Sequence, residues 1–267
     1  MMLSTRTRAG KSIASRFSAA AGTYDNHAGV QARVASQLTA LLGTDRPVGS
    51  ILEVGCGTGL LTKKLARIFP SAQICATDIS SKMIFNAQKH FRSKKSILWI
   101  AGDFREVLDL GRFDLIVSSS ALHWITPLEK TFRKISSHLK KNGLLVFGIM
   151  LKGTLAELHE ARRNTVPAKA VQKELPPEKE VLNALKAARL QIVRKQRATY
   201  RDSFRSGAHC LKSLHEQGVT GGPFSSGRTP LTRSELTELV SYYDKNYKCV
   251  DGVYATYNVL YIVAEKI

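Results

Sequence analysis

The sequence predicts an α/β protein in which seven strands form one mostly parallel sheet with helices on both faces. Short apolar runs typical of buried strands alternate with helical patterns of apolar residues through most of the chain. A glycine-rich segment, residues 55–59, directly follows the first of these strands and comes before a helix. Alternating strands and helices imply right-handed crossovers between parallel strands, so a layered sheet is the expected architecture.

The expected elements follow one another in a regular order along the chain. Strands are expected over residues 51–54, 73–77, 97–101, 113–118, 144–150, 191–204 and 253–264. Helices are expected over residues 26–42, 60–69, 81–91, 127–140, 178–189, 208–217 and 232–244. Local signals support these bounds: Pro70 ends one helical pattern, Ser80 can cap the next, and Thr232 stands at capping-box spacing from Glu235.

We predict that an N-terminal helical arm, residues 1–45, comes before a single domain, residues 46–267. A helical insertion over about residues 205–247 separates the last two strands of this domain. Within it, the 218–230 stretch is rich in Gly, Ser and Pro and is expected to form a loop. Such a helical excursion over a sheet edge is suited to act as a lid.

The N-terminus allows two interpretations. It carries basic side chains at Arg6, Arg8, Lys11 and Arg16, and no acidic residue before Asp25, a composition that resembles a mitochondrial transit peptide. The alternative is an ordered arm that closes over an active site, which we favour for residues after about 11. No apolar run is long enough for a secretory signal or a membrane span, so we expect a cytoplasmic protein.

The chain is strongly basic, with 40 Lys and Arg against 21 Asp and Glu and a formal net charge of +19. Such a charge attracts nucleic acid, an acidic membrane or an acidic protein, although a general basic bias explains it equally well. The four cysteines show no CxxC and no metal-type spacing. We therefore expect no metal site and no disulfide framework.

The strongest functional signal is the segment from Glu53 to Gly59, where an acidic residue comes before Gly55, Gly57 and Gly59. Glycines let the backbone turn sharply and approach a ligand at the start of a helix. The dinucleotide pattern GxGxxG fails because Leu60 stands at its last position. The segment resembles the first motif of class I methyltransferases, which implies a Rossmann-like fold and S-adenosylmethionine as the cofactor.

Other residues fit the same cofactor. Glu53 suits its positively charged methionine end, Asp78 can accept from two ribose hydroxyls, and Asp103 can accept from the adenine amino group. The expected cofactor-binding residues are Glu53, Gly55, Cys56, Gly57, Gly59, Asp78, Ile79, Asp103, Phe104, Ser118 and Ser119.

The segment after the fourth strand limits the methyl acceptor. The Asp/Asn-Pro-Pro-Tyr signature of amino methyltransferases is absent there, and residues 119–124 read Ser-Ser-Ala-Leu-His-Trp instead. No cysteine is placed for chemistry at pyrimidine C5. These observations are against adenine, cytosine or glutamine nitrogen and pyrimidine carbon as acceptors.

Segments outside the cofactor motifs resemble a narrower family, the malonyl-[acyl-carrier protein] O-methyltransferases of biotin synthesis. The similarity covers nearly the whole chain from about residue 12. It is carried by residues 17–25 with Ala28 and Gln31, and by residues 121–124, 153–158, 175–177 and 208–236. Lys212 stands where family members usually carry Arg, and Val219 where Ala is common. Both departures concern substrate affinity more than reaction type.

The resemblance implies methyl transfer to the free carboxylate of the malonyl thioester of acyl carrier protein. This carboxylate is already ionised at neutral pH, so no general base is required. Tyr24, His123 and Trp124 are the candidate catalytic and substrate-pocket residues, each with a purely structural alternative. A basic set is the candidate for binding the substrate or the acidic carrier protein: Lys212, Arg201 and Arg205.

Other functions fit parts of the sequence. A carboxyl methyltransferase for a free small acid, or an arginine-modifying enzyme of the complex I assembly-factor type, would use the same cofactor fold. The net charge is the only observation that supports a nucleic-acid or membrane-surface binding module, and the intact glycine motif argues against one. We predict no stable nucleic-acid partner and no membrane insertion, and the sequence leaves the oligomeric state open.

Overall fold

A computed structural model of the chain describes residues 8–43, 46–91, 96–107, 110–170, 173–220 and 230–267. Its strands are β1 (Ser50–Val54), β2 (Gln73–Asp78), β3 (Ile97–Ala101), β4 (Phe113–Ser119), β5 (Leu139–Met150), β6 (Leu190–Phe204), β7 (Lys248–Cys249) and β8 (Gly252–Lys266). Its α-helices are α1 (Arg8–Ala20), α2 (Tyr24–His27), α3 (Gly29–Leu41), α4 (Leu60–Ile68), α5 (Ser81–Lys89), α6 (Leu128–Ser137), α7 (Ala156–Thr165), α8 (Glu178–Ala187), α9 (Gly207–Glu216) and α10 (Arg233–Asn246). Two short 3-10 helices are η1 (Leu122–Trp124) and η2 (Pro167–Lys169).

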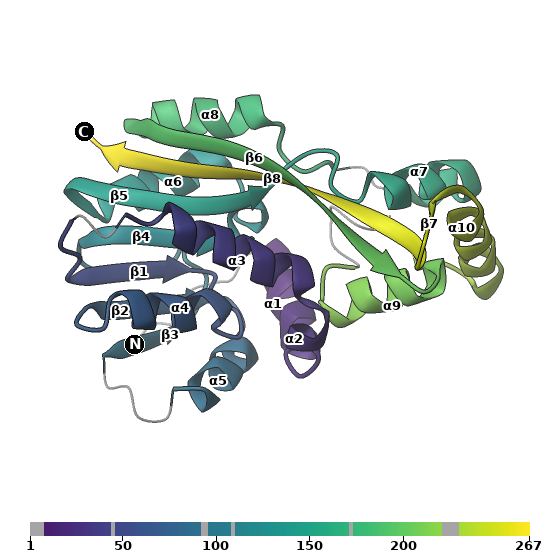
Figure 1. The fold of residues 1–267 in the computed structure, drawn as a ribbon, viewed down its shortest axis with the longest axis horizontal. Coiled ribbons are helices and arrows are strands. Elements are labelled where there is room, and N and C mark those ends of the chain that lie inside the picture. The colour runs from purple at the N-terminus through teal and green to yellow at the C-terminus, as the bar shows by residue number, and fades with distance from the viewer. Residues whose placement is uncertain (1–7, 44–45, 92–95, 108–109, 171–172, 221–229) are drawn as a thin grey trace.

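One sheet with the order β3-β2-β1-β4-β5-β8-β6 runs through the molecule, and the two-residue β7 pairs with β8 (Figure 1). Neighbouring strands are parallel from β3 to β5, while β8 is antiparallel to both β5 and β6. This arrangement confirms the predicted seven-stranded, mostly parallel sheet. Because β1, β2, β3 and β4 are parallel, their carboxyl ends lie at one edge of the sheet. The strand order reverses direction between β1 and β4, the place where open α/β sheets bind ligands.

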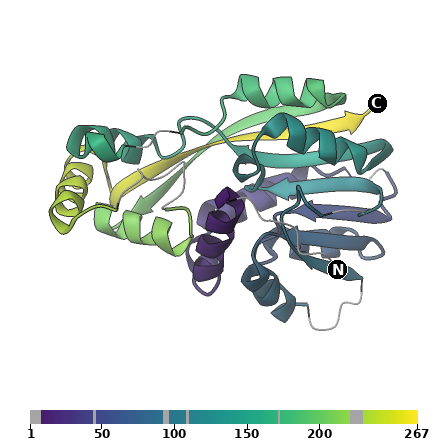
Figure 2. The same ribbon diagram turned by 180° about the vertical axis from the view of Figure 1, so that it is seen from behind.

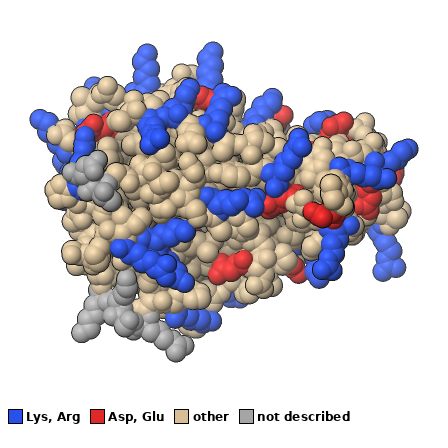
Figure 3. Space-filling view, viewed as in Figure 1, with Lys and Arg blue, Asp and Glu red and all other residues tan. Residues whose placement is uncertain are grey.

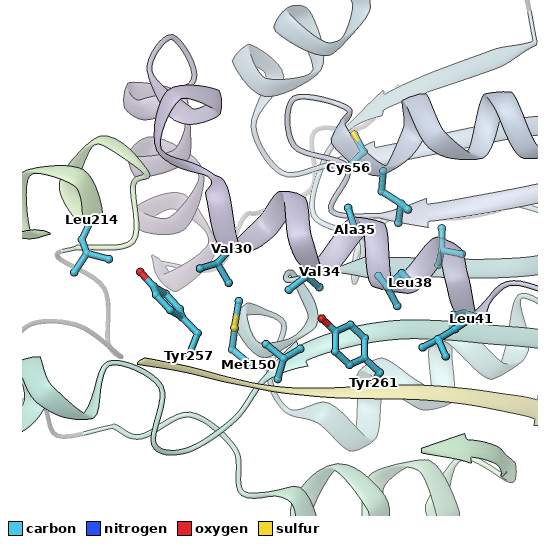
Figure 4. Packing of buried hydrophobic residues seen from close by; sticks show 14 of the residues in the cluster. Val30, Val34, Ala35, Leu38, Leu41, Cys56, Met150, Leu214, Tyr257 and Tyr261 are labelled. Carbon is cyan, nitrogen blue, oxygen red and sulfur yellow. The ribbon is translucent and has the colours of Figure 1, made fainter. Parts of the chain in front are cut away.

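The sheet is buried on both faces because successive residues of its central strands pack into two separate apolar clusters. Leu115 and Val117 belong to the cluster on the α3 and α4 side, and Ile116 belongs to the cluster on the α6 and α8 side. On α3, apolar residues at helical spacing point toward β5 and β8 (Figure 4): Val30, Val34, Leu38 and Leu41. Burying one such side chain stabilises the fold by about 1.5–3 kcal/mol.

The β6–β8 hairpin is much longer than the sheet that it completes. The pairing runs from Leu190 with Lys266 to Phe204 with Val253, whereas β5 leaves β8 at Met150. The far half of the hairpin therefore projects beyond the sheet. Helices α7, α9 and α10 lie around this projecting part (Figure 1). In both views α1 and α2 lie between the sheet and α9 (Figure 1 and Figure 2).

Most predicted elements are present, with shifts at their ends. The expected helix 26–42 is divided at Ala28 into α2 and α3, and the helix expected over 127–140 ends at Ser137. Strand β5 begins at Leu139, and its register with β4 shifts around Asn142, which has a φ of 59°. Helix α7 was not predicted. The predicted caps at Ser80 and Thr232 are both formed.

Within the arm predicted over residues 1–45, helix α1 starts at Arg8, slightly before the position, about residue 11, from which an ordered arm was favoured. Residues 1–7 and the central part of the expected 218–230 loop, residues 221–229, lie outside the described residues. Within the described residues, no helix has both the length and the apolar character required to cross a membrane.

Candidate active site

The glycine segment makes the turn from β1 into α4, and all three of its glycines have positive φ. The φ angles are 76° at Gly55, 55° at Gly57 and 90° at Gly59, in the left-handed region that glycine adopts without strain. A Cβ at position 55 would lie 2.3 Å from Cβ of Ala121, whereas one at position 57 would meet no atom within 4 Å. The turn therefore packs against the chain at Gly55 and leaves open space at Gly57.

Asp78 at the end of β2 faces this turn. Its carboxylate accepts from the backbone N–H groups of Gly57 at 2.9 Å and Ser80 at 2.8 Å. Burial raises the pKa of Asp78 to about 6, against the lowering effect of these two hydrogen bonds. The half-buried carboxylate keeps acceptor capacity beyond the two backbone bonds, as binding of ribose hydroxyls requires.

Glu53 lies behind the turn. It is 1% exposed, and its carboxylate accepts from the Thr62 hydroxyl at 2.6 Å. Burial raises the pKa of Glu53 to about 8, although the Thr62 hydrogen bond opposes the shift. Glu53 thus connects β1 to α4, and its side chain does not line the cavity described next.

A cavity with an empty volume of about 740 Å³ lies at the carboxyl ends of β1, β2, β3 and β4. The predicted cofactor residues that line it are Gly55, Gly57, Asp78, Ile79, Asp103, Phe104 and Ser119. We call it the cofactor cavity. The four remaining predicted cofactor residues, Glu53, Cys56, Gly59 and Ser118, do not line it. The Ser118 hydroxyl donates to the Val54 carbonyl at 2.8 Å.

Asp103 is held by an arginine that the sequence did not single out. The Arg105 guanidinium donates to both carboxylate oxygens of Asp103, with Nε–Oδ1 at 2.9 Å and Nη2–Oδ2 at 2.5 Å. Burial alone would raise the pKa of Asp103, but the hydrogen bonds and charge of Arg105 lower it below the usual value. The pair closes the cavity beside Phe104, with the carboxylate fixed in orientation.

A second cavity of about 590 Å³ adjoins the first, and we call it the acceptor chamber. The two cavities share the lining residues Phe17, Tyr24, Ser120 and Trp124. The other walls of the chamber come from α3, the end of β5, the start of α7, β8 and the segment after α9. Among the described residues that line it, none is Lys, Arg, Asp or Glu.

Two of the three predicted catalytic residues, Tyr24 and Trp124, stand where the two cavities meet. Burial, followed by the charges of Asp78 and Asp25, raises the pKa of Tyr24, so its hydroxyl stays protonated and can donate. The Trp124 ring packs edge-on against Phe17 of the arm, with centroids 5.6 Å apart. The structure thus brings the arm and the segment after β4 together, as expected.

The third predicted residue, His123, lines the acceptor chamber only. It is 5% exposed, and burial lowers its pKa to about 3, so its imidazole is neutral. Its Nδ1 has no hydrogen-bond partner within the described part of the chain. A neutral ring with a vacant nitrogen can bind a ligand but cannot supply a positive charge to it.

The arm connects the cofactor turn to the insertion. On the cofactor side, the Thr58 hydroxyl donates to Asp25 at 2.5 Å, and Asn86 of α5 donates to the Ala21 carbonyl at 2.6 Å. On the other side, the Thr23 hydroxyl donates to the Glu216 carbonyl of α9 at 2.9 Å. The arm therefore forms one wall that is common to both cavities.

The predicted docking residues lie away from both cavities. Arg201 neighbours Tyr200 on β6 and points to the opposite face, where its guanidinium covers the Tyr254 ring at 4.7 Å. Lys212 is exposed on α9, 3.8 Å from Glu216, and Arg205 is exposed at the end of β6. Lys and Arg are spread across the face shown in Figure 3 rather than gathered in one patch.

Several lining residues were not among the predicted site residues. Ser120 lines both cavities with a φ of 55°, and its hydroxyl has no partner among the described residues. Gln31 and Gln217 meet across the acceptor chamber although 186 positions separate them. No group of residues suited to hold a metal ion is found in the described part of the chain.

Comparisons with known proteins agree with this geometry. Residues 51–143 match the family described as a methyltransferase domain. A malonyl-[acyl-carrier protein] O-methyltransferase of Ilyobacter polytropus is 28% identical over 256 residues, covering 96% of this chain and 98% of its own. A protein of the same name from Acetivibrio thermocellus is 29% identical over 271 residues, covering 96% and 94%.

Solved structures share the fold. A Bacillus halodurans protein provisionally described as a methyltransferase has a TM-score of 0.62 at 14% identity, covering 87% of this chain and 98% of its own. Geranyl diphosphate C-methyltransferase from Streptomyces coelicolor, in complex with S-adenosyl-L-homocysteine, has a TM-score of 0.54 at 15% identity, covering 87% and 75%. With the matching domain and the glycine turn, Asp78 and cavity in place, the chain is a class I S-adenosylmethionine-dependent methyltransferase.

Proposed function

We propose that this methyltransferase methylates the free carboxylate of a malonyl thioester carried by acyl carrier protein. The observation that carries the proposal is the junction of the two cavities, where Tyr24 of the arm meets Ser120 and Trp124. The relatives named malonyl-[acyl-carrier protein] O-methyltransferases align over nearly the whole chain, including the arm and the insertion that form the acceptor chamber.

The chemistry asks little of the protein beyond placement. When bound, S-adenosylmethionine supplies a methyl group on a positively charged sulfur. Gly57, Asp78 and Phe104 would hold this cofactor, and Tyr24 and Ser120 would orient the acceptor carboxylate by donating hydroxyl hydrogens. Alignment and exclusion of water can then supply several kcal/mol of the barrier reduction.

No acid–base residue is needed at the junction, because the acceptor is ionised before it binds. The described lining agrees, because no carboxylate lines the chamber and burial lowers the pKa of both of its histidines, His123 and His159. Methylation removes the acceptor's charge, and this suits a product that must enter an apolar chain-elongation pocket.

The net charge of +19 supports an acidic carrier as the partner. Complementary charge increases the rate of encounter and makes it sensitive to salt. Lys212, Arg201 and Arg205 remain the candidates for docking on the outer surface of the hairpin and α9, away from the chamber.

Mass spectrometry with purified protein, S-adenosylmethionine and malonyl-acyl carrier protein tests the proposal. We expect the malonyl carrier to gain the mass of one methylene group and the acetyl carrier, which lacks the free carboxylate, to remain unchanged. Methylation of free malonate at an equal rate would favour the small-acid enzyme. Cofactor binding without methylation of either acceptor would refute the proposed substrate.

A further inference from the structure

A chain of polar side chains links the insertion to the acceptor chamber. His27 of α2 contacts the Glu216 carboxylate through Nε2 at 2.5 Å and the Ser213 hydroxyl through Nδ1 at 3.1 Å. Gln217 Nε2 donates to Ser213 Oγ at 3.4 Å, and Gln31 Nε2 donates to Gln217 Oε1 at 3.1 Å. The chain thus runs from Glu216 to Gln31 over three elements, α9, α2 and α3.

The donors along this chain include the His27 imidazole and the amides of the two glutamines. A carboxylate only accepts, so the His27 nitrogen that faces Glu216 carries a hydrogen. Further along the chain, Gln217 Nε2 donates to Ser213 Oγ, and the Gln217 carbonyl accepts from Gln31. The amide nitrogen of each glutamine therefore points toward the next residue of the chain.

Gln31 stands at the other end with its carbonyl unused. The residue is 9% exposed and lines the acceptor chamber, and Oε1 has no hydrogen-bond partner among the described residues. A buried carbonyl without a donor is unfavourable, because burial removes the water that would otherwise hydrogen-bond to it. Because the amide nitrogen of Gln31 donates to Gln217, its carbonyl is left as an acceptor for the chamber, and a ligand with an N–H donor would satisfy it.

We propose that Gln31 binds an amide N–H of the methyl acceptor, and that the enzyme thereby selects thioesters of a pantetheine arm over free dicarboxylic acids. The inference rests on the proposed function and names what the acceptor must carry besides its carboxylate. Free malonate has no N–H to donate. A pantetheine arm carries amide groups beyond its thioester sulfur, and both a carrier protein and coenzyme A present that arm.

Gln31 is a substrate-binding residue in this scheme, whereas Gln217, Ser213 and His27 act as positioning residues. Their contacts join α2 and α3 to the end of α9 in the insertion. An acceptor that binds Gln31 is therefore linked to the insertion through Gln217. This arrangement differs from recognition of the carboxylate itself, which takes place at Tyr24 and Ser120.

Two small acceptors of equal length test the proposal. Malonyl-N-acetylcysteamine carries one amide, and the S-pentyl malonyl thioester replaces that amide with methylene groups. For the wild-type protein we expect kcat/KM to favour the amide thioester by roughly threefold to tenfold, the value of one net hydrogen bond. In Gln31→Met this ratio should fall to one or below, with cofactor affinity and melting temperature measured alongside.

Gln37→Met is the matched control. Gln37 lies on the same helix and donates to Gln196 at 3.3 Å, but it does not line the chamber. It should keep the wild-type ratio. Gln217→Met should lower the ratio by freeing the Gln31 amide to rotate, while Gln31 itself is retained.

The possible failures can be told apart. An unchanged ratio in Gln31→Met, with both thioesters methylated, would overturn the role of Gln31 and leave the proposed function standing. Equal wild-type rates for the two thioesters would do the same. If the wild-type protein methylates neither thioester nor the malonyl carrier protein, the proposed function itself fails, and this inference fails with it.

Discussion

The cofactor cavity and the acceptor chamber share a wall but are built differently. The cofactor cavity lies on the ends of four neighbouring strands, and its main residues fall within a continuous part of the chain from Gly55 to Trp124. The acceptor chamber collects residues from α1, α3, β5, α7 and β8, so Phe17 and Tyr257 line the same space. Most residues of the first site are close together in sequence, whereas those of the second come from distant segments of the chain.

This difference separates two kinds of molecular recognition. Backbone turns and carboxylates define the first site, because the cofactor is a fixed small molecule. Apolar walls define the second, with a few polar atoms that have no partner in the part of the chain that the structure describes: Gln31 Oε1, Ser120 Oγ and His123 Nδ1. We expect changes in the first region to abolish cofactor binding and changes in the second to alter the rate or choice of acceptor.

The largest expected effect is that of Asp78→Ala on cofactor binding. The variant removes the acceptor for the ribose hydroxyls and leaves the N–H groups of Gly57 and Ser80 without their partner. Hydrogen bonds to charged groups contribute about 1.5–3 kcal/mol each, so affinity should fall roughly 100-fold. Isothermal titration calorimetry with S-adenosylmethionine measures this loss directly.

Asp114→Ala provides the control. Its carboxylate also accepts from two backbone N–H groups, those of Gly49 and Ser50, but at the opposite edge of the sheet. It should lower stability and leave cofactor affinity unchanged. Wild-type affinity should also weaken as pH falls through about 6, because protonated Asp78 loses acceptor capacity. Equal affinity for wild type and Asp78→Ala would remove Asp78 from the site.

The same contrast explains how much the sequence could predict. The succession of strands and helices along the chain, the glycine turn and the position of Asp78 follow from patterns within short segments, and the structure has them where expected. Glu53 was expected to face the cofactor, yet its partner is Thr62 one turn into α4, a contact that depends on side-chain direction. The sequence pattern fixes the position of a residue on its element and leaves its partner open.

The acceptor chamber was much less predictable. Tyr24 and Trp124 were singled out through a resemblance, whereas Gln31 with Gln217 depends on a contact between α3 and the end of α9. No local periodicity encodes such a pairing. Arg201 and Arg205 were grouped with Lys212 by charge, but alternation along β6 turns Arg201 away from the chamber.

Gly57→Ala tests whether the bound cofactor lies against the glycine turn. Its Cβ would meet no protein atom within 4 Å, so it would intrude only where the cofactor lies. We expect affinity to fall roughly tenfold or more, the cost of overpacking, while left-handed strain removes about 1–2 kcal/mol of stability.

Gly111→Ala separates the two effects. Gly111 also has a positive φ, 78°, and open space around its Cβ, but it lies far from the turn in sequence and does not line the cavity. It should share the stability loss and retain full cofactor affinity. If both variants bind the cofactor equally well, Gly57 is only a turn residue.

Tyr24→Phe tests whether the Tyr24 hydroxyl, where the two cavities meet, donates to the methyl acceptor. Losing one neutral donor to the acceptor should reduce kcat roughly threefold to tenfold, with cofactor affinity retained, because the ring still packs between the cavities. Tyr200→Phe removes a hydroxyl that contacts Tyr261 at 2.7 Å outside the chamber, and it should leave kcat unchanged. Normal turnover in Tyr24→Phe would mean that the tyrosine only packs the arm.

The smallest expected effect concerns the pH dependence of stability through His123. Burial depresses its folded-state pKa to about 3 from an ordinary 6.5, so between these values the unfolded chain binds one more proton than the folded one. The contribution of the neutral ring to stability is therefore complete above about pH 6.5, and it is lost as pH falls toward 3. The slope reaches about 1.4 kcal/mol per pH unit.

His123→Gln keeps a polar side chain of similar reach and removes this titration. Its urea-unfolding free energy should decline less steeply than that of the wild type between pH 6.5 and 4, and should run parallel to it above pH 7. Equal slopes over the acid range would show that His123 takes up a proton in the folded protein. The protonated ring could then form an ion pair with an acceptor carboxylate, and the acceptor chamber would contain a positive charge.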